Sequence, residues 1–483
     1  LRALVDANVD DLVGYVARAF SQGWPASDSS VVTGPALRTH VEQFVPQLEG
    51  VVQRLTGRLR WAMAQITRLT AIQLKQGDLE KEDKNLRTRC ESLIARMKGA
   101  RRGRREAEGY DDSNTFGVLA AEGFLPGYGL ESGSILGTAE IPYWRTGALE
   151  FSLPRAPSVA LREYVPGNLI YANGNRFVAR RFHRDVDEQR IEMPSFEVSV
   201  ERQAVKPTSR GAPGATLGGM ALQAIAVCDV DLLHQSHISD DEELRFQLGV
   251  SVFGYERNQH SGGHAYHWGP QPLHHRRGVR LRLVNVGASS SVQGDGSENR
   301  LGYPVCTVCG QSVSPLSSHL QHEKFSEAHK ERCHRPVTPV GFYADVVADS
   351  LSLPACPDRT TAFTVLEAIR FAATQVLDMH MEDLQLLVIG HVDRDDVDAL
   401  LWDPMPGGSG LLDQLLERFD EIADAARDVC SKCPSACATS CIDCLQTFRN
   451  SYYHKHLDRT VALACLDAWG RAVTVAHAIP PEQ

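Results

Sequence analysis

The sequence predicts an α+β protein of several domains, with an N-terminal helical hairpin, a β-rich middle domain and a C-terminal α/β domain that binds zinc. Three observations support this fold class. Apolar residues follow a heptad pattern near the N-terminus, short alternating runs separated by proline and glycine fill the middle, and two clusters hold eight of the 12 cysteines. We place the helical region, the β-rich domain, a zinc-knuckle insertion and the α/β domain at residues 1–110, 115–299, 300–338 and 339–483.

Length and composition are those of a globular protein. The chain has 483 residues, of which 43% are hydrophobic and 23% charged, which excludes a wholly disordered or collagen-like chain. No apolar run approaches the roughly 20 residues of a membrane-spanning helix, and we find no signal peptide, so we expect no membrane partner and a cytoplasmic location. Because the sequence begins at Leu1, we expect a fragment, a processed product or a trimmed chain.

The net charge and the positions of the cysteines restrict the classes of function that fit this chain. There are 50 lysines and arginines against 60 aspartates and glutamates, a net charge of -10. Nucleic-acid-binding proteins are often basic, so this balance argues weakly against one, although local basic stripes matter more than the sum. Clustered cysteines without a secretory signal indicate metal binding rather than disulfides.

The N-terminal region is expected to be helical. Apolar residues recur there in alternating steps of four and three: Leu48, Val52, Leu55, Leu59, Ala62, Ile66 and Leu69. Gly77-Asp78 predicts a turn, and a return helix completes a hairpin over about residues 46–100. In the basic run that follows, Arg101 and Arg102 are candidate phosphate contacts; the alternative is a solvated linker whose positive charge suits a helix C-terminus.

The middle of the chain is expected to be β-rich. Asn173-Gly174 stands between two short apolar runs and predicts a hairpin. Further strands are expected at Phe196–Val200, Gln223–Val230, Leu244–Tyr255 and Val279–Val286. Residues 256–277, with five histidines, are expected to form a loop that does not bind metal, because the histidines lack cysteine partners. Residues 287–299 are expected to be disordered.

The C-terminal region alternates helix and strand. We expect helices at Thr361–Leu377, about 411–426 and about 457–476. Strands are expected at Leu384–Gly390 and Ala399–Trp402. The glycines of Asp403–Gly410 lie between a strand and a helix, where they can cradle a phosphate or form a tight turn. No lysine follows them as in a Walker A loop, so we expect the turn.

Four cysteines near the C-terminus form the strongest chemical pattern: Cys433, Cys437, Cys441 and Cys444. Zinc prefers four tetrahedral ligands, and thiolates are the usual choice in structural sites. Steps of four place ligands on successive turns of one helical face, and the final shorter step closes the tetrahedron. Cys430 is a fifth candidate that we treat as spare, and an iron–sulfur cluster is the alternative to zinc.

A second cluster combines Cys306 and Cys309 with His329 and Cys333. A cysteine knuckle followed by a histidine and a cysteine one helical turn apart is typical of zinc sites with three cysteines and one histidine. His319 and His322 are competing ligands. Four protein ligands leave no open position, so we expect two structural zinc ions and no catalytic one.

Basic and aromatic residues follow the last cysteine: Arg449, Asn450, Tyr452, Tyr453, His454, Lys455 and Arg459. One interpretation is that the cations balance the negative charge of a four-thiolate zinc site. The other is that the arginines and lysine bind phosphates while a tyrosine stacks on a base, so these residues are candidate nucleic-acid contacts.

The motifs of several enzyme classes are not found in the sequence. There is no GxxxxGK[ST] phosphate loop, no acidic motif of the Walker B kind, no convincing Ser/His/Asp arrangement and no duplicated HxK nuclease motif. Any ATP and magnesium are therefore expected on a motor outside this chain.

The segment Cys433-Pro-Ser-Ala-Cys437 through Leu457-Asp458-Arg459 resembles the zinc-binding domain at the C-terminus of MrfA-type DEAD/DEAH helicases, and so does Leu401–Gly410. Gly123–Gly129 and Leu161–Gly167 look like the β-rich segment that follows the second motor domain in that family. Large anti-phage helicases of the DISARM and Druantia systems carry a similar C-terminal region. Residues 1–110 match nothing in this family pattern.

The resemblance implies the non-motor C-terminal part of a superfamily 2 DNA helicase. Such a part guides a DNA strand, expected to be single-stranded, beside motor domains that lie elsewhere in the same polypeptide or in a partner chain. The alternative is a zinc-stabilised adaptor subunit that binds a helicase or another defence component without touching nucleic acid. A nuclease-like enzyme is disfavoured by the motifs that are not found.

Overall fold

The computed structural model describes residues 2–21, 34–79, 81–97, 135–143, 147–183, 193–208, 220–238, 250–258, 262–288, 301–333, 337–391, 393–405 and 408–479. The chain folds into two compact units, Leu1–Gly133 with Arg184–Glu192, and Ser134–His183 with Met193–Gln483. Arg101 and Arg102 lie outside the described residues, as do most of the residues predicted to be disordered. Helices in the described part of the chain lack the run of apolar residues that crossing a bilayer requires.

The first unit is helical, and it contains α1 (Arg2–Ala7), α2 (Val9–Ser21), α3 (Gly34–Gln76) and α4 (Lys81–Met97). The chain turns between α3 and α4 at Gly77, whose φ of 83° is open to glycine at little steric cost. Trp61, Leu69 and Leu86 pack together between these two helices. The predicted hairpin is confirmed, although α3 begins twelve residues earlier than expected and carries Pro46 inside it.

A five-stranded sheet of the second unit has the order β2-β1-β8-β4-β3. Its strands are β1 (Ile135–Tyr143), β2 (Gly147–Arg155), β3 (Leu169–Ala172), β4 (Asn175–Phe182) and β8 (Val230–His237), with α6 (Pro157–Glu163) between β2 and β3. Asn173 and Gly174 join β3 to β4 with φ of 48° and 71°, the backbone of a type I′ turn. The hairpin predicted at this dipeptide is therefore confirmed.

An eleven-stranded sheet forms the rest of the framework, with the order β16-β10-β11-β13-β7-β5-β6 and four further strands attached to β11, β13 and β15. Its strands are β5 (Ser195–Ser199), β6 (Ala204–Thr208), β7 (Met220–Ala226), β9 (Val250–Asn258), β10 (Gly263–Trp268), β11 (Gln271–Ala288), β12 (Tyr303–Val305), β13 (Thr338–Ser352), β14 (Gln385–Gly390), β15 (Val397–Asp403) and β16 (Val473–Ile479). The long strands β11 and β13 pair along most of their length.

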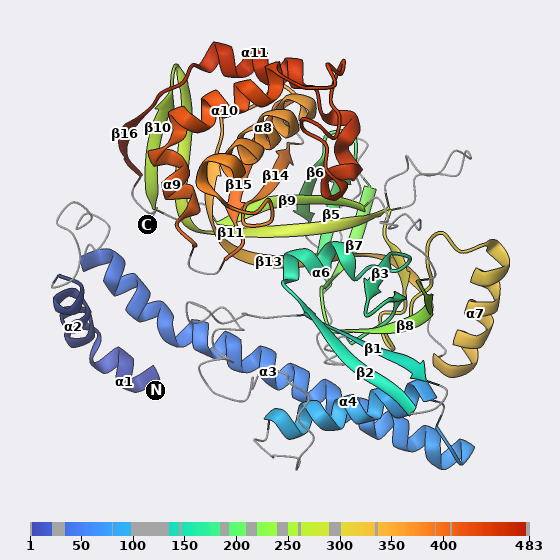
Figure 1. Ribbon diagram of the computed structural model, residues 1–483. Coiled ribbons are helices and arrows are strands. Elements are labelled where there is room, and N and C mark those ends of the chain that lie inside the picture. Colours follow the sequence, from blue (N-terminus) through green and yellow to red (C-terminus); the bar gives the residue numbers. More distant parts are fainter. Residues whose placement is uncertain are drawn as a thin grey trace. The chain divides into compact units, whose positions relative to one another are not determined.

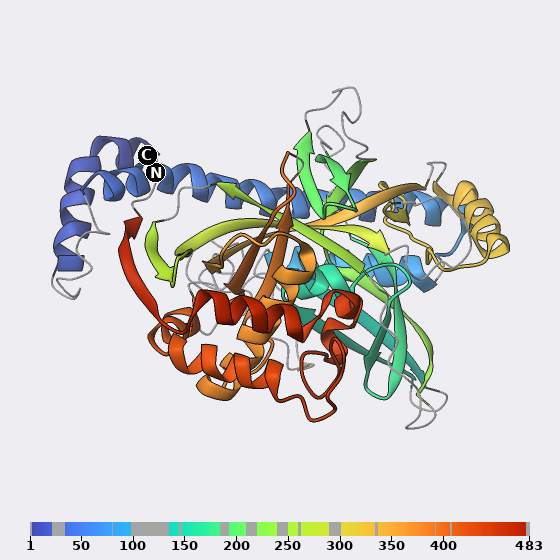
Figure 2. The ribbon, with the colours of Figure 1, turned by 90° about the horizontal axis from the view of Figure 1, so that it is seen from above.

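Helices cover one end of this sheet: α8 (Arg359–Leu377), α9 (Leu411–Glu417), α10 (Phe419–Ser431) and α11 (Arg459–Trp469). Leu366 of α8, Ile422 of α10 and Leu466 of α11 pack on Leu401 of β15 in one apolar core. Figure 1 shows these helices beside β14 and β15, and in Figure 2 the orange and red helices form a layer next to the strands. This layer carries the C-terminal cysteines.

Two further apolar cores lie on the sheets. One joins the five-stranded sheet to β11 and β13 and includes Phe177, Leu283 and Phe342. The other is enclosed by β5, β6, β7, β9 and β11 and includes Phe196 and Val284.

The boundary that we predict near residue 338 falls at the first residue of β13, and β13 pairs with β11 and β7 from the middle region. The division into four domains stays a prediction.

Three local expectations were wrong. Residues 263–277, predicted to belong to a loop, form β10 and the first part of β11. The strand predicted at Val279–Val286 is confirmed as the second part of β11. The helix expected over 411–426 is two helices, because the backbone of Arg418 is not helical. The last helix ends at Gly470, whose φ is 87°, and β-branched residues then continue as β16.

Candidate metal centres

The four C-terminal cysteines converge on one point in space. The Sγ of Cys433 lies 3.5 Å from that of Cys441 and 3.7 Å from that of Cys437, and the Sγ of Cys444 lies 3.7 Å from that of Cys437. A tetrahedral zinc with Zn–S bonds of about 2.3 Å has sulfur–sulfur edges of about 3.8 Å. The donor set and its spacing therefore fit a four-thiolate zinc ion.

The cysteines lie in turns rather than on a helix. The helix α10 ends at Ser431, two residues before Cys433, and the helical face that we expected is wrong. The backbone N–H of Cys441 donates to the Sγ of Cys444 at 3.2 Å, and that of Gln446 donates to the carbonyl of Cys441 at 2.9 Å. This knuckle brings the last two ligands together without helical geometry.

Arg459 holds the cysteine loop in place. Its Nε donates to the carbonyl of Cys437 at 2.9 Å and its Nη1 to the carbonyl of Cys430 at 2.7 Å. Its backbone N–H also donates to the carbonyl of Thr439 at 2.8 Å. The guanidinium thus places positive charge beside the thiolates, as the charge-balancing interpretation requires.

A buried ionic network fixes the segment after the cysteines, the 3-10 helix η3 (Phe448–His456), to α8. Glu367, which is 1% exposed, forms an ion pair with Arg370 at 2.7 Å. The same carboxylate accepts a hydrogen bond from the hydroxyl of Tyr453 and one of 2.9 Å from Nδ2 of Asn450. These hydrogen bonds and the ion pair hold η3, the segment directly after the cysteines, against α8.

The pKa values of the cysteine thiols differ with their surroundings. A hydrogen bond from the backbone of Cys437 lowers the pKa of Cys433 to about 7, whereas burial raises the pKa of Cys444 to about 12. Burial also raises the pKa of Cys430 to about 12. Cys430 packs in the apolar core and is outside the group of four converging sulfur atoms, in line with its treatment as spare.

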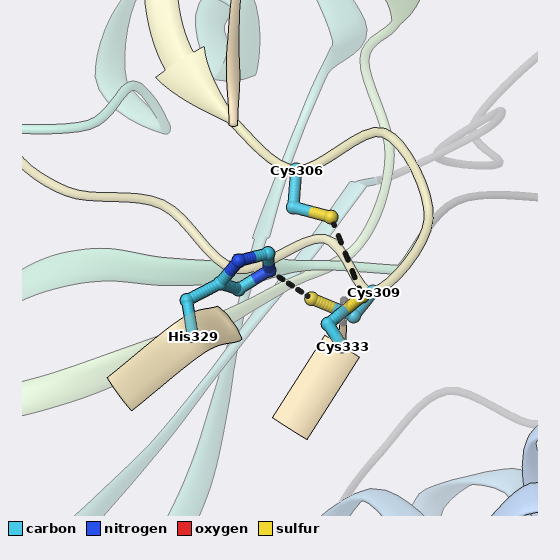
Figure 3. Close-up of side chains that lie close together, drawn as sticks. All are labelled: Cys306, Cys309, His329 and Cys333. Carbon is cyan, nitrogen blue, oxygen red and sulfur yellow. Dashed lines mark hydrogen bonds between the residues drawn. The ribbon is translucent and has the colours of Figure 1, made fainter. Parts of the chain in front are cut away.

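The second cluster forms where a cysteine knuckle meets the end of a helix. Cys306 and Cys309 flank the turn after β12, and α7 (His319–Cys333) presents His329 and Cys333 from its last turn. The Sγ atoms of Cys306 and Cys333 are 3.7 Å apart, and the Sγ of Cys309 is 3.3 Å from Nε2 of His329. Figure 3 shows the four side chains pointing toward one another.

This arrangement fits a zinc ion with three thiolates and one imidazole. The sulfur–nitrogen separation is shorter than the sulfur–sulfur separation, as expected because a Zn–N bond is shorter than a Zn–S bond. The donor atoms of each cluster lie within 4.8 Å of one another. His319 and His322, the competing ligands, lie at the other end of α7 and are not in the group. Among the described residues, the histidines of β10 and β11 do not form a metal-binding group either, and His260 lies outside those residues.

The candidate nucleic-acid contacts separate into exposed and interior residues. The side chain of Arg449 is 68% exposed and lies 2.8 Å from Glu382, and Lys455 is exposed. Asn450 is 1% exposed and Tyr453 3%, and Tyr453 stacks on Phe363 at 4.4 Å between ring centroids. Neither can reach a strand in this conformation, which does not support the contacts predicted for them.

The remaining candidates bind other parts of the protein. The hydroxyl of Tyr452 accepts a hydrogen bond from Arg162, whose guanidinium also lies over the tyrosine ring at 5.0 Å. His454 contacts the carbonyl of Thr447 through Nε2 at 2.9 Å. Sequence reasoning missed Glu367, Arg370 and Arg162; the only signal was a charged pair three residues apart in the apolar helix α8.

The glycine-rich turn after β15 is already occupied by a carboxylate. Asp403 accepts hydrogen bonds from the backbone N–H of Met405 at 2.9 Å and from the N–H and hydroxyl of Ser409. The donors that would bind a phosphate are thus used within the chain. This arrangement favours the tight turn over the phosphate cradle.

Comparisons with known proteins agree with these features. Residues 365–445, from α8 through all four C-terminal cysteines, match a family model described as the MrfA Zn-binding domain. Druantia protein DruE of Escherichia coli (strain UMEA 4076-1) is 28% identical over 218 residues, which cover 39% of this chain and 12% of that protein. These two findings confirm the resemblance to the C-terminal region of MrfA-type helicases.

Two solved structures of the DUF1998 helicase MrfA are also similar. The complex with DNA has a TM-score of 0.33 at 11% identity and covers 78% of this chain and 39% of that one. The complex with DNA and AMPPNP has a TM-score of 0.26 at 9% identity and covers 76% and 35%. The chain therefore spans well under half the length of the relatives that it matches.

Proposed function

We propose that this chain is the non-motor C-terminal part of an ATP-dependent superfamily 2 DNA helicase or translocase, where it guides the nucleic-acid strand and is stabilised by zinc. The observation that carries the proposal is the four-thiolate centre within residues 365–445, the segment that matches the MrfA Zn-binding domain. ATP and magnesium act on motor domains in the same polypeptide or in a partner chain.

Zinc serves folding in this proposal. Each cluster supplies four protein donors, so a bound ion has no open position for substrate or water. The ion at the C-terminal cluster holds the turns that follow α10, and Arg459 and the Glu367 network hold the same region from the protein side. Bacterial anti-phage defence in the cytoplasm is the proposed setting, by similarity to the Druantia protein.

Single-stranded DNA is the proposed partner. The described structure leaves Arg449 and Lys455 as the exposed cations of the segment that we expected to contact it. Arg101 and Arg102 remain candidates outside the described residues.

The adaptor alternative has one observation in its favour. Most of the polar groups in residues 450–459 bind other parts of the chain, including the network around Glu367 and the carbonyls of the cysteine loop. Polar groups used in this way support the metal centre and are not available to bind a nucleic-acid strand. An adaptor that does not contact nucleic acid requires only this structural role.

Metal content and DNA binding together test the proposal. Elemental analysis of protein purified without added metal should give close to two zinc ions per chain, and fluorescence anisotropy should detect binding to a labelled oligothymidine that weakens with salt. Iron with visible absorption would replace zinc by a cluster. Zinc-replete protein that binds no oligonucleotide at low salt would favour the adaptor.

A further inference from the structure

The strands β9 and β13 pair with β11 on either side of it (Figure 1). One face of these three strands carries several arginines. Leu281 and Leu283 of β11 point into the core shared with the five-stranded sheet, so the alternating residues Arg280 and Arg282 lie on the other face. The cross-strand register places Tyr255 and Asp345 beside Arg282, and Val347 beside Arg280. Tyr343 precedes Asp345 by two residues on β13, and Arg257, at a bulge of β9, joins the set through its ion pair with Asp345. We call this set the arginine face: Tyr255, Arg257, Arg280, Arg282, Tyr343, Asp345 and Val347.

One carboxylate orders two of the three arginines. Arg282 binds Asp345 through Nε at 2.6 Å and Nη2 at 2.5 Å, and Nη1 of Arg257 lies 2.8 Å from Oδ2 of the same aspartate. The guanidinium of Arg282 also lies over the ring of Tyr343, 4.4 Å from its centroid. The guanidinium groups are thus held in place on rigid strands rather than on mobile loops.

Charge on the arginine face is opposite to that of the whole chain. Three arginines and one aspartate give it a net charge of +2, while the chain carries -10. Its outer residues are accessible: Arg257 has a 44% exposed side chain, Val347 is 52% exposed, and Arg280 is exposed. Arg282 lies deeper, with a side chain 13% exposed. A local excess of positive charge on an acidic protein indicates an anionic partner.

Aromatic rings within the basic patch favour one class of anion. Tyr255 and Tyr343 lie directly beside the arginines, and they continue into the apolar core enclosed by β5, β6 and β7. Sheet faces that combine cations with aromatic and arginine planes bind single strands, because phosphates take the cations while bases stack. An acidic peptide would use the arginines alone.

We propose that the arginine face binds single-stranded nucleic acid, with phosphates at Arg280 and Arg257 and bases against the layer formed by Arg282, Tyr343 and Val347. This inference rests on the proposed function and deepens it, since it assigns the strand to the sheet instead of the segment 448–459. Asp345 then limits the affinity, because it neutralises part of the charge that the strand would contact.

Three exposed substitutions test the arginine face in the zinc-replete full chain. Anisotropy with labelled 20-nucleotide oligothymidine and oligouridine is measured at several salt concentrations. Arg280→Ala should weaken binding several-fold and reduce the salt slope by about 0.7. Val347→Glu should weaken it further, and Asp345→Asn should strengthen it, an effect that damage to the fold cannot produce. Arg471→Ala, which removes an exposed arginine paired with Asp424 beyond α11, should change nothing.

The outcomes separate this inference from the function on which it rests. Binding by the unaltered chain with no change in the Arg280 and Val347 variants overturns the inference and leaves the proposed function standing. Loss confined to Arg449→Ala and Lys455→Ala would place the strand at η3 and also overturn it. If neither oligonucleotide binds the unaltered chain, both proposals fall, and binding of polyglutamate instead would assign the face to an acidic protein segment.

Discussion

At the scale of single residues, Cys430 differs from the four neighbouring cysteines in the position of its sulfur atom. Cys430 and Cys444 both lie in the apolar core, but only Cys444 belongs to the group of four converging sulfur atoms. We expect Cys444→Ser to remove one zinc equivalent, because a serine hydroxyl is a poor replacement for a thiolate. Cys430→Ala should retain both ions. Measuring the zinc content of the two variants tests whether Cys430 is a ligand. Equal zinc loss in both would show that it is.

The buried carboxylate of Glu367 gives a second prediction. Glu367→Gln removes the negative charge that neutralises Arg370, a residue 7% exposed, and leaves an uncompensated buried cation. Breaking one partner of such a pair costs about 3–5 kcal/mol of unfolding free energy.

Chemical denaturation measures this change, and the matched control is Glu421→Gln. Glu421 pairs with Arg418 three residues away, as Glu367 does with Arg370, but both side chains of the control pair are exposed. The control should change stability little. Equal effects of the two substitutions would mean that burial of the Glu367 pair is unimportant.

The sequence predicted the residues that converge at the two metal centres, because the spacing of cysteines and histidine along the chain is itself a short-range pattern. It did not predict the roles of Asn450 and Tyr453. Their partner Glu367 lies more than 80 residues away. Nothing in the local sequence distinguishes an asparagine and a tyrosine that face solvent from a pair that binds a buried carboxylate. Only the packing of η3 on α8 distinguishes the two.

At the scale of elements, the turns from Cys433 to Leu445 depend on the metal more than the strands beneath them. We expect a chelator that removes zinc to accelerate amide hydrogen exchange over about residues 433–457 while β14 and β15 stay protected. The strands are buried on both faces and fully paired with each other, whereas the cysteine loop has few backbone hydrogen bonds of its own. Mass spectrometry of the peptides measures this, and uniform loss of protection would indicate global unfolding.

Elements with a clear local pattern were predicted, and those without one were not. The helix α8 and the strands β14 and β15 have long apolar runs that fix their type. The hairpin β10–β11 is rich in histidine and glycine, and its strand conformation comes from pairing with β13 and β16. Such long-range pairing overrides local propensity, so a loop was the wrong expectation.

At the scale of the whole molecule, the chain alone is expected to hydrolyse no ATP. Its sequence has no phosphate loop and no acidic metal-binding motif of the kind that phosphoryl transfer requires. Phosphate release should stay at the background level with and without single-stranded DNA. Turnover stimulated by DNA that survives further purification would contradict the prediction and require a motor within these residues.

The pairing of β16 with β10 has a consequence for synthesis on the ribosome. The edge of β10 is covered by residues 473–479, although β10 itself is made about two hundred residues earlier. A nascent chain therefore displays one unpaired edge of β10, which β11 does not cover, throughout the translation of the α8–α11 layer. Unpaired edges invite association with other chains. Slow translation or early termination within this interval should make the truncated product prone to aggregation and dependent on chaperones.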